Sequence, residues 1–382
     1  MFYQLPPVGN PVCLSRGDAG NPLSQDIFHP YVPKYYASGT AALAASITAA
    51  IRIKGVADPE VILPAYGCPD LVSAAVFAGA KPVLVDLARD RPWMDIDELS
   101  SRLNTNTVAI VAVSLFGIPE RMETLRQVSD RQGVLLIEDS AQAFPGEPGD
   151  GFWSGDLVIL SFGRGKPVSL LGGGAVLFQD AGIGGQLTGV GDSPAGPLRM
   201  RLLSRIYNLM ISPRLYWIPQ CLPFLHLGET RYLPLSGIAP MAQSTLELLE
   251  RNIYIYQNDK PVNQARMSAM LNQIGVDTGL LMNLPALCRA PDALRLLRYP
   301  LLVDPGRRDR CLCLLKRAGL GPSRMYPAAL PGIRGLERLL SGQGDFPVAE
   351  DFARRILTLP THRRVSFADI DKMGLILDSC LH

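Results

Sequence analysis

Four polar side chains follow two neighbouring predicted strands and are placed to act on one ligand. Asp139 and Gln142 come after the apolar run 134–138. Ser161 ends the next apolar run, and Lys166 stands five residues further on. Because open α/β sheets bind ligands at the carboxyl ends of their strands, we expect the four residues to meet there. Together they supply a carboxylate, an amide, a hydroxyl and an amine.

The start of an Ala-rich helical segment adds a candidate anion site. Ser38 can cap this segment, so the helix is expected to begin near residue 40. Gly39 and Thr40 then lie where backbone N–H groups and a hydroxyl attract an anion. With Ser161 they are the predicted contacts of a phosphate group.

Pyridoxal phosphate is a cofactor that needs these kinds of partner. The amine of Lys166 can form a Schiff base with its aldehyde. The carboxylate of Asp139 can keep its pyridine nitrogen protonated, so that the ring withdraws electrons. The sequence therefore predicts pyridoxal 5′-phosphate as the cofactor, with Lys166 and Asp139 as catalytic residues.

Two other phosphate-binding loops do not fit the glycine-rich stretch that contains Lys166. A P-loop needs glycine where the chain has Leu160, and Ser or Thr where it has Pro167. A dinucleotide fingerprint that starts at Gly163 needs its third glycine where Val168 stands. A G-x-S-x-G nucleophile elbow is absent from the sequence. ATP, NAD and hydrolase chemistry of that type are therefore not supported.

Length and charge favour a small-molecule ligand. The chain has 382 residues, 47% of them hydrophobic, which suits a large buried core and two to three domains. A net charge of +2 gives no broad electrostatic reason to bind nucleic acid. The seven cysteines and four histidines are scattered, so neither a disulfide framework nor a metal site is expected.

Two segments bear on location. The N-terminal residues 1–12 lack the pattern of a signal peptide, which predicts a cytoplasmic protein. The most membrane-like stretch, 209–227, contains an arginine and three prolines, so it is expected to be a packed or interface loop and not a spanning helix. Its aromatic residues, if exposed, could instead contact a membrane surface or a lipid-linked substrate. These residues are Tyr216, Trp217 and Phe224.

Alternation of short β-branched runs with helical segments predicts a doubly wound α/β domain. The predicted strands are Val61–Pro64, Pro82–Asp86, Val108–Ser114, Val134–Glu138, Leu157–Ser161 and Ala175–Phe178. The predicted helices between them are Pro69–Phe77, Asp97–Leu103 and Met122–Arg131. A long helix is predicted over 239–257. We therefore divide the chain into a large domain, 1–238, and a smaller α+β domain, 239–382.

Several strings, in this order and spacing, resemble the DegT-type sugar aminotransferases, which are fold type I pyridoxal-phosphate enzymes. The resemblance runs from about residue 35 to the C-terminus. Its main strings are ASGTAAL (37–43), IEDSAQ (137–142), SFGRGK (161–166), GGGAV (172–176) and ILTLPTH (356–362), with GAKPVLVD (79–86) and LFG (115–117) as further support. It implies a large domain with a mostly parallel sheet and a smaller C-terminal domain.

The resemblance also assigns roles to single residues. Lys166 matches the lysine that holds the cofactor and moves the proton, and Asp139 the residue that binds the pyridinium nitrogen. Gln142 would contact the 3-hydroxyl of the ring. Such enzymes are dimers with shared sites, and the partner's phosphate contact matches Thr230 or Arg231.

This chain departs from the family pattern at several positions. The residue stacked on the cofactor ring matches the segment of Tyr66 and Cys68, and we take Tyr66 as the candidate because a thiol cannot stack. The family's histidine before the Leu-aromatic-Gly turn is Ser114 here, and its Gly-Glu-Gly-Gly is 171–174. These changes leave the cofactor contacts in place and leave the sugar open.

The predicted function is transfer of an amino group from an amino acid, with glutamate as the expected donor, to a nucleotide-linked keto sugar in amino-sugar or polysaccharide biosynthesis. Two alternatives stay open. One is another pyridoxal-phosphate reaction on an amino acid. The other is a non-catalytic regulatory or scaffold protein that keeps the fold.

Overall fold

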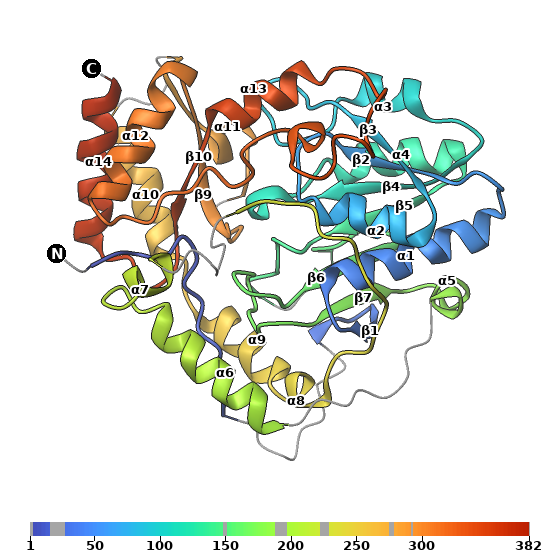
Figure 1. Cartoon of the computed structure of the whole chain (residues 1–382), viewed down its shortest axis with the longest axis horizontal. Helices are drawn as coiled ribbons and strands as arrows, with labels where there is room; N and C mark the ends of the chain where they lie inside the picture. Colours follow the sequence, from blue (N-terminus) through green and yellow to red (C-terminus); the bar gives the residue numbers. More distant parts are fainter. Residues whose placement is uncertain are drawn as a thin grey trace.

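The chain folds into two β-sheets with helices packed around them (Figure 1). The computed structural model describes residues 3–15, 27–147, 151–187, 197–221, 229–274, 279–291 and 293–381. A seven-stranded sheet lies within residues 32–178, and a three-stranded sheet lies within residues 281–360. This arrangement confirms the predicted α/β class.

The large sheet is mostly parallel. Its strands are β1 (Val32–Tyr36), β2 (Glu60–Pro64), β3 (Lys81–Val85), β4 (Thr107–Val113), β5 (Leu135–Asp139), β6 (Leu157–Ser161) and β7 (Gly174–Phe178). Their order across the sheet is β1-β7-β6-β5-β4-β2-β3. Only β7 runs against its neighbours, β1 and β6. The sequence pattern identified β2 to β7 within a residue or two at most ends, and it missed β1.

Helices cover both faces of this sheet, which gives three layers. On one face lies α1 (Gly39–Lys54), whose small side chains pack on β4, β6 and β7 and on α2 (Asp70–Ala78). On the other face α3 (Ile96–Arg102) and α4 (Met122–Gln132) cover the strands β2 to β5. The core is therefore split by the sheet, and the strand ends remain open for a site.

The predicted long helix over 239–257 is wrong in its start and its continuity. The segment instead forms α8 (Gln243–Leu246) and α9 (Leu249–Asn258), and α10 (Val262–Gln273) follows after Pro261. Residues up to Pro240 stay extended because they pair with the end of β1: Ala37 N donates to Ala239 O at 2.8 Å. A tertiary hydrogen bond outweighs local helix propensity here.

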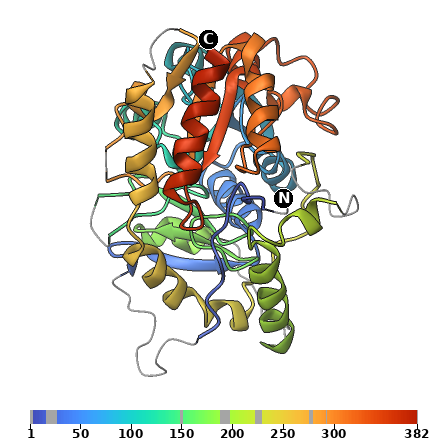
Figure 2. The same ribbon diagram turned by 90° about the vertical axis from the view of Figure 1, so that its left-hand side faces the viewer.

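The smaller sheet consists of β8 (Leu281–Asn283), β9 (Arg298–Val303) and β10 (Ile356–Pro360), all antiparallel. The helices α10, α12 (Pro305–Arg317) and α14 (Phe367–Leu381) pack beside it (Figure 2). This is the α+β arrangement that the sequence predicts for the C-terminal part; the division at residue 238 stays a prediction. The remaining helices are α5 (Ala181–Gln186), α6 (Pro197–Met210), α7 (Trp217–Gln220), α11 (Leu284–Leu287) and α13 (Pro347–Arg355).

The stretch 209–227 holds the end of α6 and the short α7, and residues 222–227 lie outside the described residues. Tyr216 and Trp217 are both partly buried, as a packed loop requires. Within the described part of the chain, no helix is both long and apolar enough to cross a membrane.

The N-terminal segment contacts the C-terminal part of the chain as well as the large sheet, where Val12 packs in the same buried cluster as residues of β6 and β7. Leu5 N donates to Gly319 O at 2.8 Å, and Pro6 O contacts Nε2 of His362 at 2.9 Å. A Cβ on Gly9 would meet the His362 ring at 2.9 Å. Because this ring is buried, the pKa of His362 falls to about 4. The imidazole is therefore neutral in the fold near pH 7.

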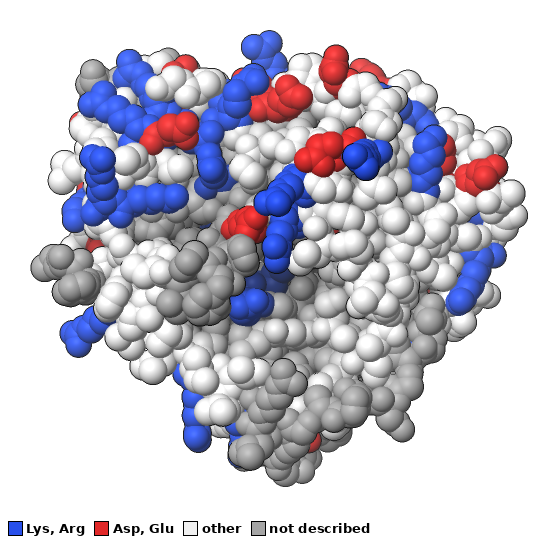
Figure 3. Space-filling view, viewed as in Figure 1, with Lys and Arg blue, Asp and Glu red and all other residues white. Residues whose placement is uncertain are grey.

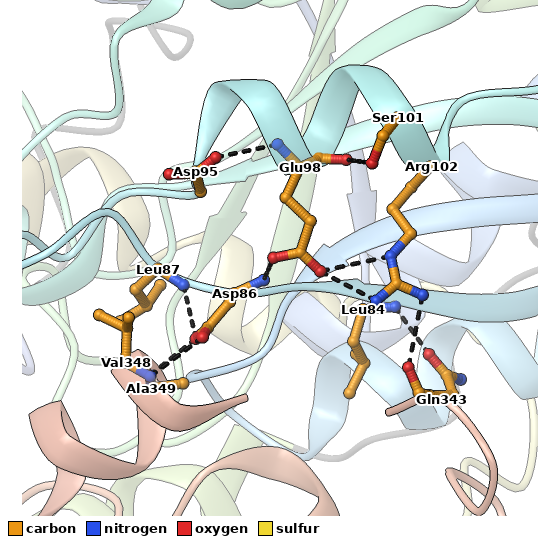
Figure 4. A network of polar contacts seen from close by, with 10 residues as sticks. All are labelled: Leu84, Asp86, Leu87, Asp95, Glu98, Ser101, Arg102, Gln343, Val348 and Ala349. Atoms are coloured by element: carbon orange, nitrogen blue, oxygen red, sulfur yellow. Dashed lines mark hydrogen bonds and ion pairs between the residues drawn. The ribbon is translucent and has the colours of Figure 1, made fainter. Parts of the chain in front are cut away.

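A carboxylate fastens α13 to the large sheet (Figure 4). The side chain of Asp86, at the end of β3, accepts hydrogen bonds from the N–H groups of Leu87 (2.8 Å), Val348 (3.0 Å) and Ala349 (2.7 Å). The residue that precedes α13, Phe346, has no side chain able to cap it. Asp86 therefore takes over the capping role for a helix that begins more than 250 residues further along the chain.

We predict that Asp86→Ala lowers the free energy of unfolding by about 3 kcal/mol, since three N–H groups lose their acceptor. Urea unfolding followed by circular dichroism measures this loss. Asp58→Ala, at an exposed aspartate, is the matched control and should change stability by less than about 0.5 kcal/mol. Equal unfolding midpoints for the two variants would contradict the capping role.

Acid should weaken the contact at His362. The unfolded imidazole takes a proton below about pH 6.5, whereas the folded one stays neutral down to about pH 4. Stability is therefore full above pH 6.5 and is lost as the pH falls toward 4, by up to about 3 kcal/mol. Unfolding midpoints across this range should fall more steeply for the wild type than for His362→Gln. Parallel curves would show that His362 does not contribute to the acid sensitivity.

Candidate active site

A cavity of about 530 Å³, open to solvent, lies at the carboxyl ends of the central strands. This volume includes the part of the cavity that is open to solvent. Six of the predicted site residues line it: Gly39, Thr40, Asp139, Gln142, Ser161 and Lys166. The structure therefore brings together the polar groups that the sequence places after separate strands.

Close backbone packing sets the first helix beside the strand ends. Ser38 caps α1 by accepting a hydrogen bond from Ala41 N at 3.1 Å. A Cβ on Gly39 would lie 2.7 Å from the Cβ of Ser161. A Cβ on Gly174 would lie 2.6 Å from the backbone of both Ser38 and Gly39. The N–H groups at the start of α1 can approach the cavity because these two positions are glycine.

Asp139 is a buried carboxylate at the end of β5. It is 8% exposed, and its Oδ1 accepts the N–H of Ala141 at 2.9 Å. Burial raises the pKa of Asp139, while the Ala141 hydrogen bond and the charge of Lys166 oppose this rise. Such a carboxylate is ready to be stabilised by a cation placed in the cavity.

Lys166 lies on the loop between β6 and β7, and its main chain is held in place. The side-chain amide of Asn10 donates to the carbonyl oxygens of Lys166 (3.3 Å) and Pro167 (3.1 Å). The backbone turns tightly before it, where Gly165 has φ +74°. The amine therefore enters the cavity from a loop that the N-terminal segment supports.

Gln142 is held by hydrogen bonds to both halves of the chain. Its Oε1 accepts Phe116 N at 3.0 Å, and its Nε2 donates to the hydroxyl of Tyr326 at 3.2 Å. Gln142 is 4% exposed, so both contacts are shielded from water. The amide is thus oriented before any ligand arrives.

Tyr66 does not line the cavity, although the sequence analysis places it on the cofactor ring. It is fully buried behind the cavity wall, and its hydroxyl donates to Tyr326 O at 3.1 Å. Its ring packs edge-on against Phe352, with centroids 5.0 Å apart. Cys68 lines the cavity instead. The apolar pattern could not separate a core tyrosine from a stacking one, and the structure gives Tyr66 a packing role.

Among the polar lining residues, Asp70 and Tyr326 were missed by sequence reasoning, and Cys68 was named there but set aside in favour of Tyr66. Burial raises the pKa of Cys68 to about 12, so its thiol is neutral. Asp70 accepts a hydrogen bond from the hydroxyl of Thr40 at 3.0 Å. The sequence signal for Asp70 was available, since it begins the helix after β2 at the same edge of the sheet. Tyr326 gave no such signal, because it lies in the other half of the chain.

Thr230 and Arg231 lie on an extended segment away from this cavity. Tyr232 N donates to Arg334 O at 3.1 Å, and the next residue, Leu233, accepts the hydroxyl of Ser73 at 2.8 Å. Neither Thr230 nor Arg231 lines the cavity of its own chain. Their predicted contact with a second copy stays a prediction.

The cavity fits pyridoxal phosphate by the chemistry of its donors. It holds an amine from Lys166 and a buried carboxylate from Asp139 on separate strand ends. It also holds a glycine cradle at Gly39, which a larger residue would fill. Aldehyde, pyridinium nitrogen and phosphate are the groups that these three features suit.

Known proteins resemble this chain along most of its length. Residues 35–187 match the model of the DegT/DnrJ/EryC1/StrS aminotransferase family. A UDP-N-acetyl-3-dehydro-alpha-D-glucosamine 3-aminotransferase of Acidithiobacillus ferrooxidans is 27% identical over 349 residues, which span 91% of this chain and 83% of that protein. The family resemblance predicted from the sequence strings is thereby confirmed.

Solved structures confirm the fold. Helicobacter pylori PseC, an aminotransferase involved in the biosynthesis of pseudoaminic acid, has a TM-score of 0.69 at 16% identity and covers 99% of this chain and 98% of its own. NtdA from Bacillus subtilis, solved with the bound cofactor PMP, has a TM-score of 0.70 at 18% identity. The match covers 95% of this chain and 78% of the NtdA chain. The expected fold type I architecture is therefore present.

We predict that Tyr326→Phe weakens binding of pyridoxal phosphate about three- to tenfold, because Gln142 loses the acceptor that orients it. The phenyl ring keeps the packing on Tyr66, so the fold should survive. Titration of the apoprotein, with circular dichroism as the fold check, measures the effect.

Tyr256→Phe is the matched control. It also removes a buried hydroxyl, which donates to Phe144 O at 3.3 Å outside the cavity. Its affinity for the cofactor should stay at the wild-type value. If both variants bind equally well, Tyr326 has no part in the site.

Proposed function

Since residues 35–187 match the model of the DegT/DnrJ/EryC1/StrS aminotransferase family, we propose that the chain transfers an amino group to a keto sugar carried on a nucleotide. The observation that carries this proposal is the shared cavity of Lys166, Asp139 and the N-terminus of α1. Pyridoxal phosphate, when bound, supplies an aldehyde that accepts the amino group and a ring that withdraws electrons.

Lys166 is the residue assigned to covalent attachment and proton movement. Its amine is the only lysine nitrogen among the described residues that line the cavity. Its Nζ would hold the aldehyde of the cofactor and, when free, would be the group that takes a proton from the donor carbon and returns it. The hydrogen bonds from Asn10 hold the loop, and with it this nitrogen, beside the strand ends.

Asp139 is assigned to the pyridinium nitrogen. A buried carboxylate with one backbone hydrogen bond gains a second partner when it faces a protonated nitrogen. This contact offsets the burial that raises the pKa of Asp139 in the chain by itself. Gln142, already oriented by Tyr326, is assigned to the 3-hydroxyl.

The start of α1 is assigned to the phosphate, with Gly39 and Ser161 as its close contacts. Thr40 is assigned there as well, although its hydroxyl donates to Asp70 in this structure. Rotation about χ1 redirects such a hydroxyl at small cost. The carboxylate of Asp70 makes this anion site less favourable than a helix N-terminus alone, so a further positive contribution is required.

That contribution is assigned to a second copy of the chain. We propose a homodimer in which Thr230 or Arg231 of the partner subunit completes the phosphate site. In support, both residues lie on an extended segment that their own cavity does not use. We also propose that the protein is cytoplasmic, as the sequence predicts.

Glutamate is proposed as the amino donor, and an amino sugar as the product. The relative from Acidithiobacillus ferrooxidans is named for amination at carbon 3 of a UDP-linked sugar. A substrate of the same class, a keto sugar on a nucleoside diphosphate, is the one to test first here.

We predict that the purified protein shows a visible absorption band with pyridoxal phosphate, that glutamate bleaches it, and that Lys166→Ala abolishes both. Lys81→Ala is the matched control, because Lys81 is 69% exposed and pairs with Glu60 far from the cavity. It should behave as the wild type does. Turnover of a UDP-linked keto sugar should fall by at least about a thousandfold in Lys166→Ala alone.

Other outcomes would point to the alternatives. A protein that forms the band but takes no amino group from glutamate, and instead releases ammonia and a keto acid from an amino acid with a leaving group on its β-carbon, such as serine, would indicate elimination chemistry. A protein that forms no band dependent on Lys166 would contradict the enzyme assignment and favour a scaffold role.

A further inference from the structure

The helix α6 turns an apolar face to solvent. Leu202, Leu203, Ile206 and Leu209 are 59%, 46%, 48% and 54% exposed. Residues 202, 206 and 209 have the i, i+4, i+7 spacing that places them along one side of a helix. We call these four side chains the α6 stripe. It is continuous over two turns.

The burial pattern of α6 is the reverse of that of an ordinary surface helix. Ser204, a polar residue, is fully buried against the protein, and its hydroxyl has no hydrogen-bond partner among the described residues. The leucines point away from the protein instead. A helix that only packed on its own domain would bury the apolar stripe and expose the serine.

The charged residues on α6 and just beyond it are all positive. Arg201 and Arg205 are exposed and lie four residues apart, beside the stripe, and Arg214 is exposed just beyond the helix. None of them forms an ion pair within the described part of the chain. The sequence from 193 to 228 contains four arginines and no aspartate or glutamate. In Figure 3 blue side chains border the surface over α6.

A second copy of the chain is a poor occupant of this surface. A twofold contact centred on the stripe places this patch against itself, so the arginines would face arginines with no acidic residue of α6 between them. Four partly exposed aliphatic side chains also present far less than the ~800 Å² that each partner buries in a stable interface. An anionic lipid surface matches both features, because headgroups attract the arginines and the acyl boundary takes the leucines.

We propose that α6 docks the protein on the surface of an anionic lipid bilayer, with the α6 stripe in the acyl boundary and Arg201 and Arg205 at the headgroups. The helix has 14 residues, too few to span a bilayer and enough to lie in its plane. It lies at the periphery of the molecule, where no other described helix or strand covers its outer face (Figure 2). The proposal does not depend on the reaction that the cavity catalyses.

The experiment is cosedimentation of the full-length protein, loaded with cofactor, with vesicles of phosphatidylcholine alone or mixed with phosphatidylglycerol. We expect binding to the mixed vesicles only, weakened by added salt. The double variant Leu202→Glu with Ile206→Glu should lose at least about tenfold in the partition coefficient. The double variant Arg201→Glu with Arg205→Glu should lose a similar amount and thereby tests the charge separately.

Leu375→Glu is the matched control, since Leu375 is 72% exposed on α14, another face of the molecule. It should bind vesicles as the wild type does. Circular dichroism and light scattering report the fold and the mass of each variant. Equal sedimentation with both kinds of vesicle would overturn the proposal. A stripe variant that turns from dimer to monomer would also overturn it, because the α6 stripe would then be an interface between copies.

Discussion

The site depends on the close approach between the first turn of α1 and the ends of β6 and β7. Glycine at 39 and 174 lets the backbone of the helix start lie within contact distance of both strands. Ala37 O accepts Gly173 N at 2.8 Å, which ties the residues before the helix to the strand that follows the Lys166 loop. The helix N-terminus, Ser161 and Lys166 therefore move as one unit. A methyl group at either glycine would separate the anion site from the amine.

The other wall of the cavity is built by the second half of the chain. Tyr326 reaches Gln142, Leu330 N donates to Ala65 O, and Asp86 caps α13 from the end of β3. Each contact joins residues more than 180 positions apart. The cavity is complete only when the C-terminal part of the chain packs against the large sheet. Loss of this packing would therefore also disorder the site.

Local patterns and long-range contacts explain what the sequence could predict. The buried strands, the cap at Ser38 and the polar residues after β5 and β6 follow from periodicity and residue type, and all lie where expected. Strand β1 was not predicted because its partner, β7, is about 140 residues away in the sequence. Tyr66 was misplaced for the same reason: its hydroxyl bonds to Tyr326, 260 residues along the chain. Periodicity registers that a side chain is buried, not which distant group it meets.

The charges in the cavity make the case for a shared site. Among the described residues, the cavity lining holds two carboxylates, Asp139 and Asp70, against one amine, Lys166, before any phosphate enters. The N-terminus of α1 contributes about half a positive charge, which does not offset a phosphate beside Asp70. A basic group from outside the chain would restore the balance, and Arg231 has the right sign and an exposed position. Electrostatics thus supports the proposed pairing of subunits by a route that does not use the family resemblance.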